Sequence, residues 1–166
     1  ANLGDRESFC RLAVRMVHET DGCRVDSVSR LYRTEPVGVF GHGWYLNAAM
    51  KVHTTLSPYM LLERLLDVEA SLGRVRTGIL DPRVIDLDLL LFGKTVTTEP
   101  GLVLPHPRMH LRRFVMVPMA EIAPGLVHPV LGVTLEDLLE SCPEEGQGVS
   151  PFPSEGIGCG PGGWSG

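Results

Sequence analysis

The sequence has no long apolar run, no paired-cysteine motif and no excess of positive charge. None of its hydrophobic stretches reaches the roughly 18 residues that a membrane-spanning helix requires. The first five residues lack the basic and apolar regions of a secretory signal. The four cysteines form no C-x-x-C pair, which disfavours a zinc knuckle and is ordinary for a reduced protein. We therefore expect a cytoplasmic protein without a membrane partner.

The net charge and the length of the sequence further restrict the class of protein. The formal net charge of -5 disfavours general binding to nucleic acid. A chain of 166 residues suits one domain with a substantial core, which we assign to residues 1–142. From Pro143 the composition shifts to Gly, Pro, Ser and Glu, with few aliphatic residues. We expect residues 143–166 to be a disordered tail, because such a segment buries too little apolar surface to order itself.

The apolar pattern predicts a mixture of helices and strands. Helices are expected over 5–20 with Asp5 as N-cap, over 58–73 with Ser57 as N-cap, over 114–122 with a break near Pro118, and over 135–139. Strands are expected over 23–34 and 45–55, as an antiparallel pair joined by a loop, and within 81–92. This order predicts an α+β fold of the ferredoxin-like βαββαβ kind, an antiparallel sheet with helices packed on it, whose first strand is missing from the sequence.

The stretch DPRVIDLDLLLF, residues 81–92, sets two carboxylates into an apolar run. In a strand, Ile85 and the leucines at every second position would face the core, while Asp86 and Asp88 project together from the other face. Burying bare carboxylates costs several kcal/mol unless a cation compensates them. A metal ion would do so. Taken alone, however, this short motif favours a half-exposed strand edge whose polar face is acidic, rather than a metal site.

Basic residues precede and follow the acidic stretch. Arg74 and Arg76 lie just before it, Arg83 lies within it, and a later group comprises His106, Arg108, His110, Arg112 and Arg113. Arginine binds phosphate oxygens in a bidentate manner, and carboxylates with phosphate oxygens are the usual environment of magnesium. The combination indicates a magnesium–polyphosphate site. A zinc site at His106 and His110 is disfavoured, because Pro107 opposes a helix there and no third ligand is evident.

Seven segments together carry a resemblance to a known family. They are ANLGD (1–5), YRTEPVG (32–38), YLNAA (45–49), Glu69 with GRVR (73–76), PRVIDLDLL (82–90), PHPRM (105–109) and RRF (112–114). In this order they resemble the 6-hydroxymethyl-7,8-dihydropterin pyrophosphokinases of folate biosynthesis. The resemblance implies an enzyme, an ATP-dependent diphosphotransferase that moves pyrophosphate from MgATP to the pterin alcohol and releases AMP. We also expect a monomer that binds these small-molecule substrates and no nucleic acid.

The resemblance also implies roles for individual residues. Asp86 and Asp88 would hold two Mg2+ ions that bridge the ATP phosphates. The pterin would be bound by Thr34, Pro36, Val37, Tyr45, Asn47 and Phe114. ATP would be bound by Glu69, Arg74, Arg83, His106 and Arg112. Arg74, Arg76 and Arg83 would act in catalysis with the two aspartates, Arg76 from a loop that closes over the reactants.

The sequence departs from the family pattern at three places. Leu80-Asp81 stands where the family has Trp-Gly, so stacking by that tryptophan is lost, and the loop is one residue shorter. Pro107 stands where tyrosine is frequent. The first strand is missing. A catalytically impaired nucleotide- or pterin-binding remnant, or an N-terminally truncated copy, is therefore the alternative, and one domain of a longer folate-synthesis protein is a further one.

Overall fold

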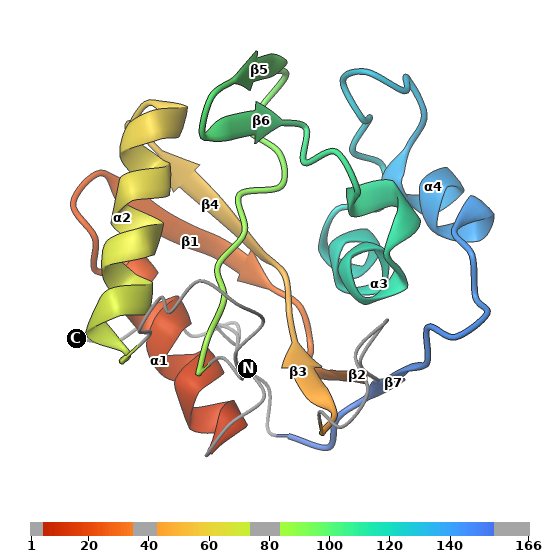
Figure 1. Ribbon diagram of the computed structural model, residues 1–166, viewed down its shortest axis with the longest axis horizontal. Coiled ribbons are helices and arrows are strands. Elements are labelled where there is room, and N and C mark those ends of the chain that lie inside the picture. Colours follow the sequence, from red (N-terminus) through yellow and green to blue (C-terminus); the bar gives the residue numbers. More distant parts are fainter. Residues whose placement is uncertain (1–4, 35–42, 74–83, 155–166) are drawn as a thin grey trace.

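The computed structural model describes residues 5–34, 43–73 and 84–154 (Figure 1). Within these ranges helices and antiparallel strands mix, which confirms the predicted α+β class. None of the described helices is long and apolar enough to cross a bilayer. The elements in chain order are α1 (Arg6–His18), β1 (Cys23–Val28), β2 (Tyr32–Thr34), β3 (Tyr45–Asn47), β4 (Met50–Thr54), α2 (Pro58–Ser71), β5 (Thr97–Glu99), β6 (Leu102–Leu104), the 3-10 helix η1 (Met109–Leu111), α3 (Arg113–Ile122), α4 (Leu135–Ser141) and β7 (Val149–Pro151).

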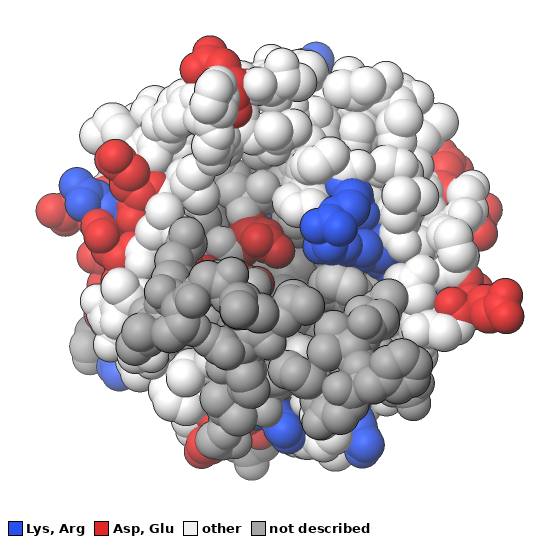
Figure 2. Space-filling view, viewed as in Figure 1, with Lys and Arg blue, Asp and Glu red and all other residues white. Residues whose placement is uncertain are grey.

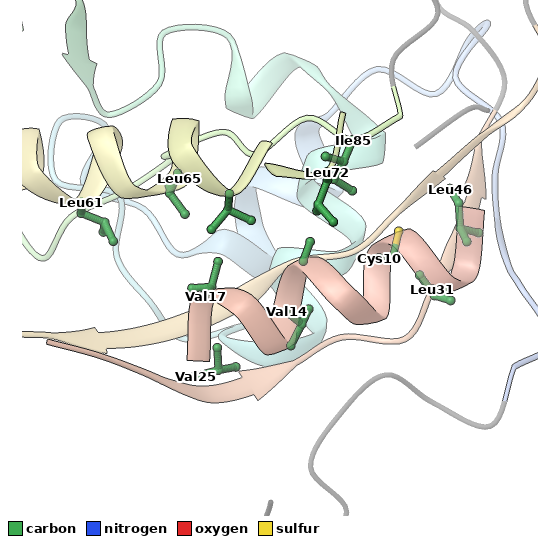
Figure 3. Packing of buried hydrophobic residues seen from close by; sticks show 12 residues of the cluster. Cys10, Val14, Val17, Val25, Leu31, Leu46, Leu61, Leu65, Leu72 and Ile85 are labelled. Carbon is green, nitrogen blue, oxygen red and sulfur yellow. The ribbon is translucent and has the colours of Figure 1, made fainter. Parts of the chain in front are cut away.

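Helices α1 and α2 begin at the predicted caps. Asp5 accepts the Ser8 backbone N–H at 3.1 Å, and the Ser57 hydroxyl accepts that of Met60 at 3.3 Å. These bonds satisfy N–H groups of the first turn that have no acceptor inside the helix. The apolar stripes of both helices meet in one core with β1 and Ile85 (Figure 3). Its buried residues are Cys10, Ala13, Val14, Val17, Val25, Leu31, Leu46, Leu61, Leu65, Val68, Leu72 and Ile85.

The two long predicted strands are each divided in two. β1 pairs with β4, whereas β2 pairs with β3 in a second sheet that continues to β7. The division falls at Ser29 and Ala49. Ser29 donates its backbone N–H to the Ala49 carbonyl, and its hydroxyl accepts the Ala49 N–H, each at 2.9 Å. The Ser29 side chain thus replaces one backbone hydrogen bond of the strand pair, and both strand segments leave the first sheet at this point.

The acidic stretch is extended but is not a strand, contrary to the prediction. Residues 84–92, the light green segment between α2 and α3 in Figure 1, pair with no strand in the part of the chain that the structure describes. The alternation of faces is nevertheless present, with Ile85 buried and Asp86 and Asp88 exposed. The alternation of apolar and acidic residues indicates which side chains are buried, whereas a strand also requires a hydrogen-bonded neighbour.

Helices α3 and α4 pack together in a second core that includes Met109 of η1. The predicted break at Pro118 is wrong, since α3 continues through it. Pro118 is buried, so packing on this face holds the helix despite the missing N–H. At α4, Thr134 and Asp137 form a reciprocal capping box.

The structure describes residues 143–154 of the predicted tail, and they include the strand β7. β7 pairs antiparallel with β2, and the Phe152 N–H donates to the Leu31 carbonyl at 2.8 Å. The Phe152 ring stacks on Trp44 with 5.7 Å between ring centroids. A segment of low apolar content can order when another sheet offers it an edge, which its composition does not reveal. Residues 155–166 lie outside the described ranges, and the domain boundary stays a prediction.

Candidate active site

Asp86 and Asp88 lie on the same side of the extended segment 84–92. Both are exposed, whereas Ile85 is 4% exposed and packs into the first core together with Leu87 and Leu89. The apolar face therefore anchors the segment to the core and leaves the two carboxylates on the surface. Figure 2 shows acidic surface in the middle of this face of the molecule, over the position of the segment.

Glu69 of α2 fixes the backbone between the two aspartates. Glu69 is only 2% exposed, and one of its carboxylate oxygens accepts the Leu87 backbone N–H at 2.6 Å. Hydrogen bonds to an ionised acceptor are among the stronger ones. Since Leu87 stands between Asp86 and Asp88, this bond sets the position from which both carboxylates project. The structure thus places Glu69 beneath the acidic segment, and its predicted contact with ATP stays a prediction.

His106 is attached to the same segment from the other side. Its backbone N–H donates to the Leu90 carbonyl at 2.9 Å. Its Nδ1 accepts the Arg108 backbone N–H at 3.2 Å. An accepting Nδ1 means that the neutral ring carries its proton on Nε2. Nε2 is then a hydrogen-bond donor.

The acidic pair and the basic residues act on one another electrostatically. Burial lowers the pKa of His106, opposed by Asp88 and assisted by Arg112 and Arg108. Burial also lowers the pKa of Arg112, and the charge of Arg108 lowers it further. The charges of Asp88 and Asp86 act in the opposite direction and raise this pKa. In Figure 2 a basic cluster stands beside the acidic surface, over η1 and the start of α3. Opposite charges are therefore arranged around one site.

The predicted pterin residues that the structure describes come from β2, β3 and α3. Thr34 pairs with Tyr45 across the two strands, and the Asn47 side-chain amide donates to the Thr34 hydroxyl at 2.6 Å. Phe114 lies near the start of α3, with the Arg112 guanidinium 5.6 Å from its ring centroid.

Helix α3 is held against this pair of strands. It packs on both β2 and β3, and the Tyr32 hydroxyl donates to Glu121 at 2.8 Å. Glu121 also forms an ion pair with Arg30 at 3.1 Å. The Phe114 ring on α3 and the Asn47 amide on β3 therefore belong to one packed unit.

Several predicted site residues lie outside the described ranges. They are Pro36, Val37, Arg74, Arg76 and Arg83, together with the Leu80-Asp81 departure. Two residues at the site were not assigned a role from the sequence. Arg108 belonged to the basic group without a role, and Gln147 lay in the predicted tail. No local pattern points to Gln147, because its partners at the start of α3 are 34 residues away.

The fold and site define an α+β protein in which two exposed carboxylates lie in one electrostatic neighbourhood with His106 and Arg112. The start of α3 adds an aromatic ring, and β3 adds an amide that is oriented by a hydrogen bond. Magnesium-complexed polyphosphates are bound by such carboxylate and arginine sets. Residues 1–124 match the family model described as 7,8-dihydro-6-hydroxymethylpterin-pyrophosphokinase (HPPK). The chain belongs to this family.

Curated relatives agree with the family match. The chain is 43% identical over 122 residues to the 2-amino-4-hydroxy-6-hydroxymethyldihydropteridine pyrophosphokinase of Bacillus subtilis, covering 74% of this chain and 73% of the relative. It is 44% identical over 139 residues to the protein of the same name from Methylorubrum extorquens, covering 84% and 87%. It is also 36% identical over 146 residues to the folic acid synthesis protein fol1 of Schizosaccharomyces pombe, covering 88% of this chain and 20% of that longer protein.

Proposed function

We propose that this chain transfers pyrophosphate from MgATP to 6-hydroxymethyl-7,8-dihydropterin in folate biosynthesis, giving the pterin diphosphate and AMP. Family membership and the names of the relatives support this activity. The observation that carries it is the position of the exposed Asp86 and Asp88 on a segment to which the His106 backbone is hydrogen-bonded at 2.9 Å, within the electrostatic influence of Arg112. The predicted monomeric state and cytoplasmic location stay predictions.

The donor set at the acidic segment fits magnesium. Mg2+ is usually held by one or two carboxylates together with water and substrate phosphates, rather than by a full cage of protein ligands. Asp86 and Asp88 supply two exposed carboxylates, and the described residues contain no group of three or more His, Cys, Asp or Glu that could hold a metal by themselves. We assign two Mg2+ ions to this pair. When bound, they would neutralise charge on the transferred group.

Nucleotide and pterin would occupy opposite sides of the acidic pair. Arg112 would neutralise phosphate charge, and Nε2 of His106 would donate a hydrogen bond to a phosphate oxygen. Asn47 would bind the polar edge of the pterin beside the Tyr45 and Phe114 rings. The same proposal assigns pterin contacts to Thr34, Pro36 and Val37, and nucleotide contacts to Glu69, Arg74, Arg76 and Arg83.

In the reaction, the hydroxymethyl oxygen of the pterin attacks the β-phosphorus of ATP. The new O–P bond forms as the bond from this phosphorus to the oxygen of the α-phosphate breaks, so AMP leaves, and the hydroxyl proton passes to solvent. Transfer of this type depends mainly on alignment and charge neutralisation, so a strong base is not required. The residues of this chain therefore act by holding the two reactants in line and by stabilising negative charge.

A finer description of the fold belongs to the same proposal. We assign a ferredoxin-like βαββαβ sandwich to this chain. The extended segment 84–92, with alternating burial and no paired strand in the described ranges, supports this assignment. A further strand beside it would complete the sheet. If the chain is instead an impaired remnant, it would bind ATP or pterin and release no AMP.

The test measures AMP released from MgATP with and without the pterin alcohol. We expect release that depends on the pterin, and a loss of more than about 100-fold in Asp86→Asn, since even residues that only orient metal ligands contribute about 10- to 100-fold. Asp67→Asn is the matched control, because Asp67 is an exposed residue of α2 that forms an ion pair with Arg64 at 3.2 Å on the helix surface. ATP loss without pterin, or full activity in Asp86→Asn, would refute the proposal.

A further inference from the structure

Residues 143–154 lie beyond the part of the chain that matches the family model, yet they contact both walls of the candidate site. β7 pairs with β2, so that Val149 lies opposite Thr34. Two residues earlier, Gln147 reaches the junction between η1 and α3. The C-terminal segment is thus joined to the strand with the pterin residues and to the helix start with Arg112.

Gln147 is bonded to the backbone on each side of Arg112. Its Oε1 accepts the Arg113 N–H at 2.9 Å, and its Nε2 donates to the Leu111 carbonyl at 3.1 Å. Nε2 also donates to the Pro143 carbonyl at 3.0 Å, which holds the glutamine within its own segment. One primary amide therefore binds the residue before Arg112 and the residue after it.

The start of α3 needs such a partner. Arg112 occupies the N-cap position and makes no side-chain cap bond, since a guanidinium carries donors and no acceptor. The Arg113 N–H belongs to the first turn, where no acceptor exists inside the helix. Gln147 supplies this acceptor. On the other side, the Arg112 carbonyl accepts the N–H groups of Val115 and Met116, each at 3.0 Å.

We propose that Gln147, the only glutamine in the sequence, is a positioning residue that fixes the backbone of Arg112 and so directs its guanidinium toward the nucleotide phosphates. The inference rests on the proposed function, because Arg112 has a phosphate to meet only if ATP binds here. Gln147 acts through Arg112 and touches no substrate. Its loss therefore weakens nucleotide binding much more than pterin binding.

The experiment compares wild type with Gln147→Met, which keeps the length of the side chain and removes its hydrogen bonds. The readouts are the Kd of a non-hydrolysable MgATP analogue and the KM values for ATP and for the pterin. The control is Glu144→Gln on the same segment, which removes only the ion pair with Arg113 from a side chain that is 78% exposed. We expect the analogue Kd to rise about tenfold in Gln147→Met, equivalent to about 1.4 kcal/mol, with the pterin KM and the control unchanged.

An analogue Kd in Gln147→Met equal to the wild-type value would overturn the inference. So would equal increases in the KM values for ATP and for the pterin, since these would indicate a general structural role. If Gln147→Met does not fold, hydrogen exchange of the wild-type Arg113 amide decides. We expect this amide to exchange at least about tenfold more slowly than an unstructured one. Exchange without protection would refute the hydrogen bond from the Arg113 N–H to Gln147, and with it the inference. Wild-type chain that binds the analogue without transferring pyrophosphate would refute the proposed function alone.

Discussion

Replacing Glu69 would test how the acidic segment is held in place. Glu69 is buried in α2, and its carboxylate accepts the Leu87 N–H at 2.6 Å. Glu69→Gln keeps an oxygen in the same place and removes the charge. Glu69→Ala removes the acceptor and leaves a cavity between α2 and the segment that carries Asp86 and Asp88.

The two substitutions should destabilise the protein to different extents. A hydrogen bond to a charged group contributes about 1.5–3 kcal/mol, whereas one between neutral groups contributes about 0.5–1.5 kcal/mol. Glu69→Gln should therefore lower the free energy of unfolding by about 1 kcal/mol. Glu69→Ala should lower it by about 2–4 kcal/mol, because the cavity adds to the lost bond. Urea unfolding at neutral pH measures both values.

The functional consequence is measured by titrating Mg2+ at saturating ATP and pterin. If Glu69 places the two aspartates, Glu69→Gln should raise the Mg2+ concentration for half-maximal AMP release about tenfold, the lower end of the effect of residues that orient metal ligands. Glu63→Gln, an exposed position on the same helix, is the control. A Glu69→Gln variant with reduced stability and wild-type Mg2+ dependence would show that Glu69 does not place the two aspartates for metal binding.

Two further predictions concern stability. His128 is 4% exposed, and its Nδ1 accepts two backbone N–H groups; burial, assisted by His110, lowers its pKa. Because the unfolded chain then binds more protons below about pH 6.5, stability should be complete above that pH and fall as the pH is lowered. His106 contributes in the same direction. Urea titrations between pH 7.5 and 5 should show a smaller decline in His128→Gln, and an equal decline would contradict this reasoning. Phe152→Ala should lower the unfolding free energy by about 1–2 kcal/mol, since the ring stacks on Trp44; unchanged thermal unfolding would contradict it.

Local signals were sufficient for the helices. Asp5, Ser57 and Thr134 each precede an apolar periodic stretch, and each accepts the predicted first-turn bond. Such signals succeed because the cap and the stripe lie within a few residues of one another. The prediction of a break at Pro118 was wrong because it used local sequence alone. The packing that keeps α3 intact comes from residues that are remote in the sequence.

Strand boundaries and the tail were beyond local reasoning. Ser29 bonds to a residue 20 positions away, and this bond divides two strands at once. β7 orders on the edge of β2, which the composition of residues 143–154 does not reveal. Segment 84–92 shows the alternation of a strand without a paired neighbour in the described ranges. Periodicity predicted burial correctly, but pairing partners depend on tertiary structure.

The roles of the candidate site residues stay predictions, but the structure brings several of these residues together. Asp86, Asp88, His106 and Arg112 lie in one electrostatic neighbourhood. Thr34, Tyr45 and Asn47 share one pair of strands. The supporting bonds were not predicted, because they join side chains to backbone groups far away in the sequence. The residue type alone does not distinguish a glutamine that binds the backbone at the start of a helix from one that is exposed to solvent.

Both halves of the candidate site depend on a side chain that binds a backbone group next to the functional residues. Glu69 holds the N–H between the two aspartates, and Gln147 holds the groups on either side of Arg112. Because phosphoryl-type transfer depends on alignment, a displacement of either backbone changes the distance between the carboxylates and the guanidinium even when every charged group is retained. The reactive geometry therefore depends on these bonds to peptide groups as well as on the charged side chains, and Glu69→Ala and Gln147→Met should act by displacing the backbone that carries the functional residues.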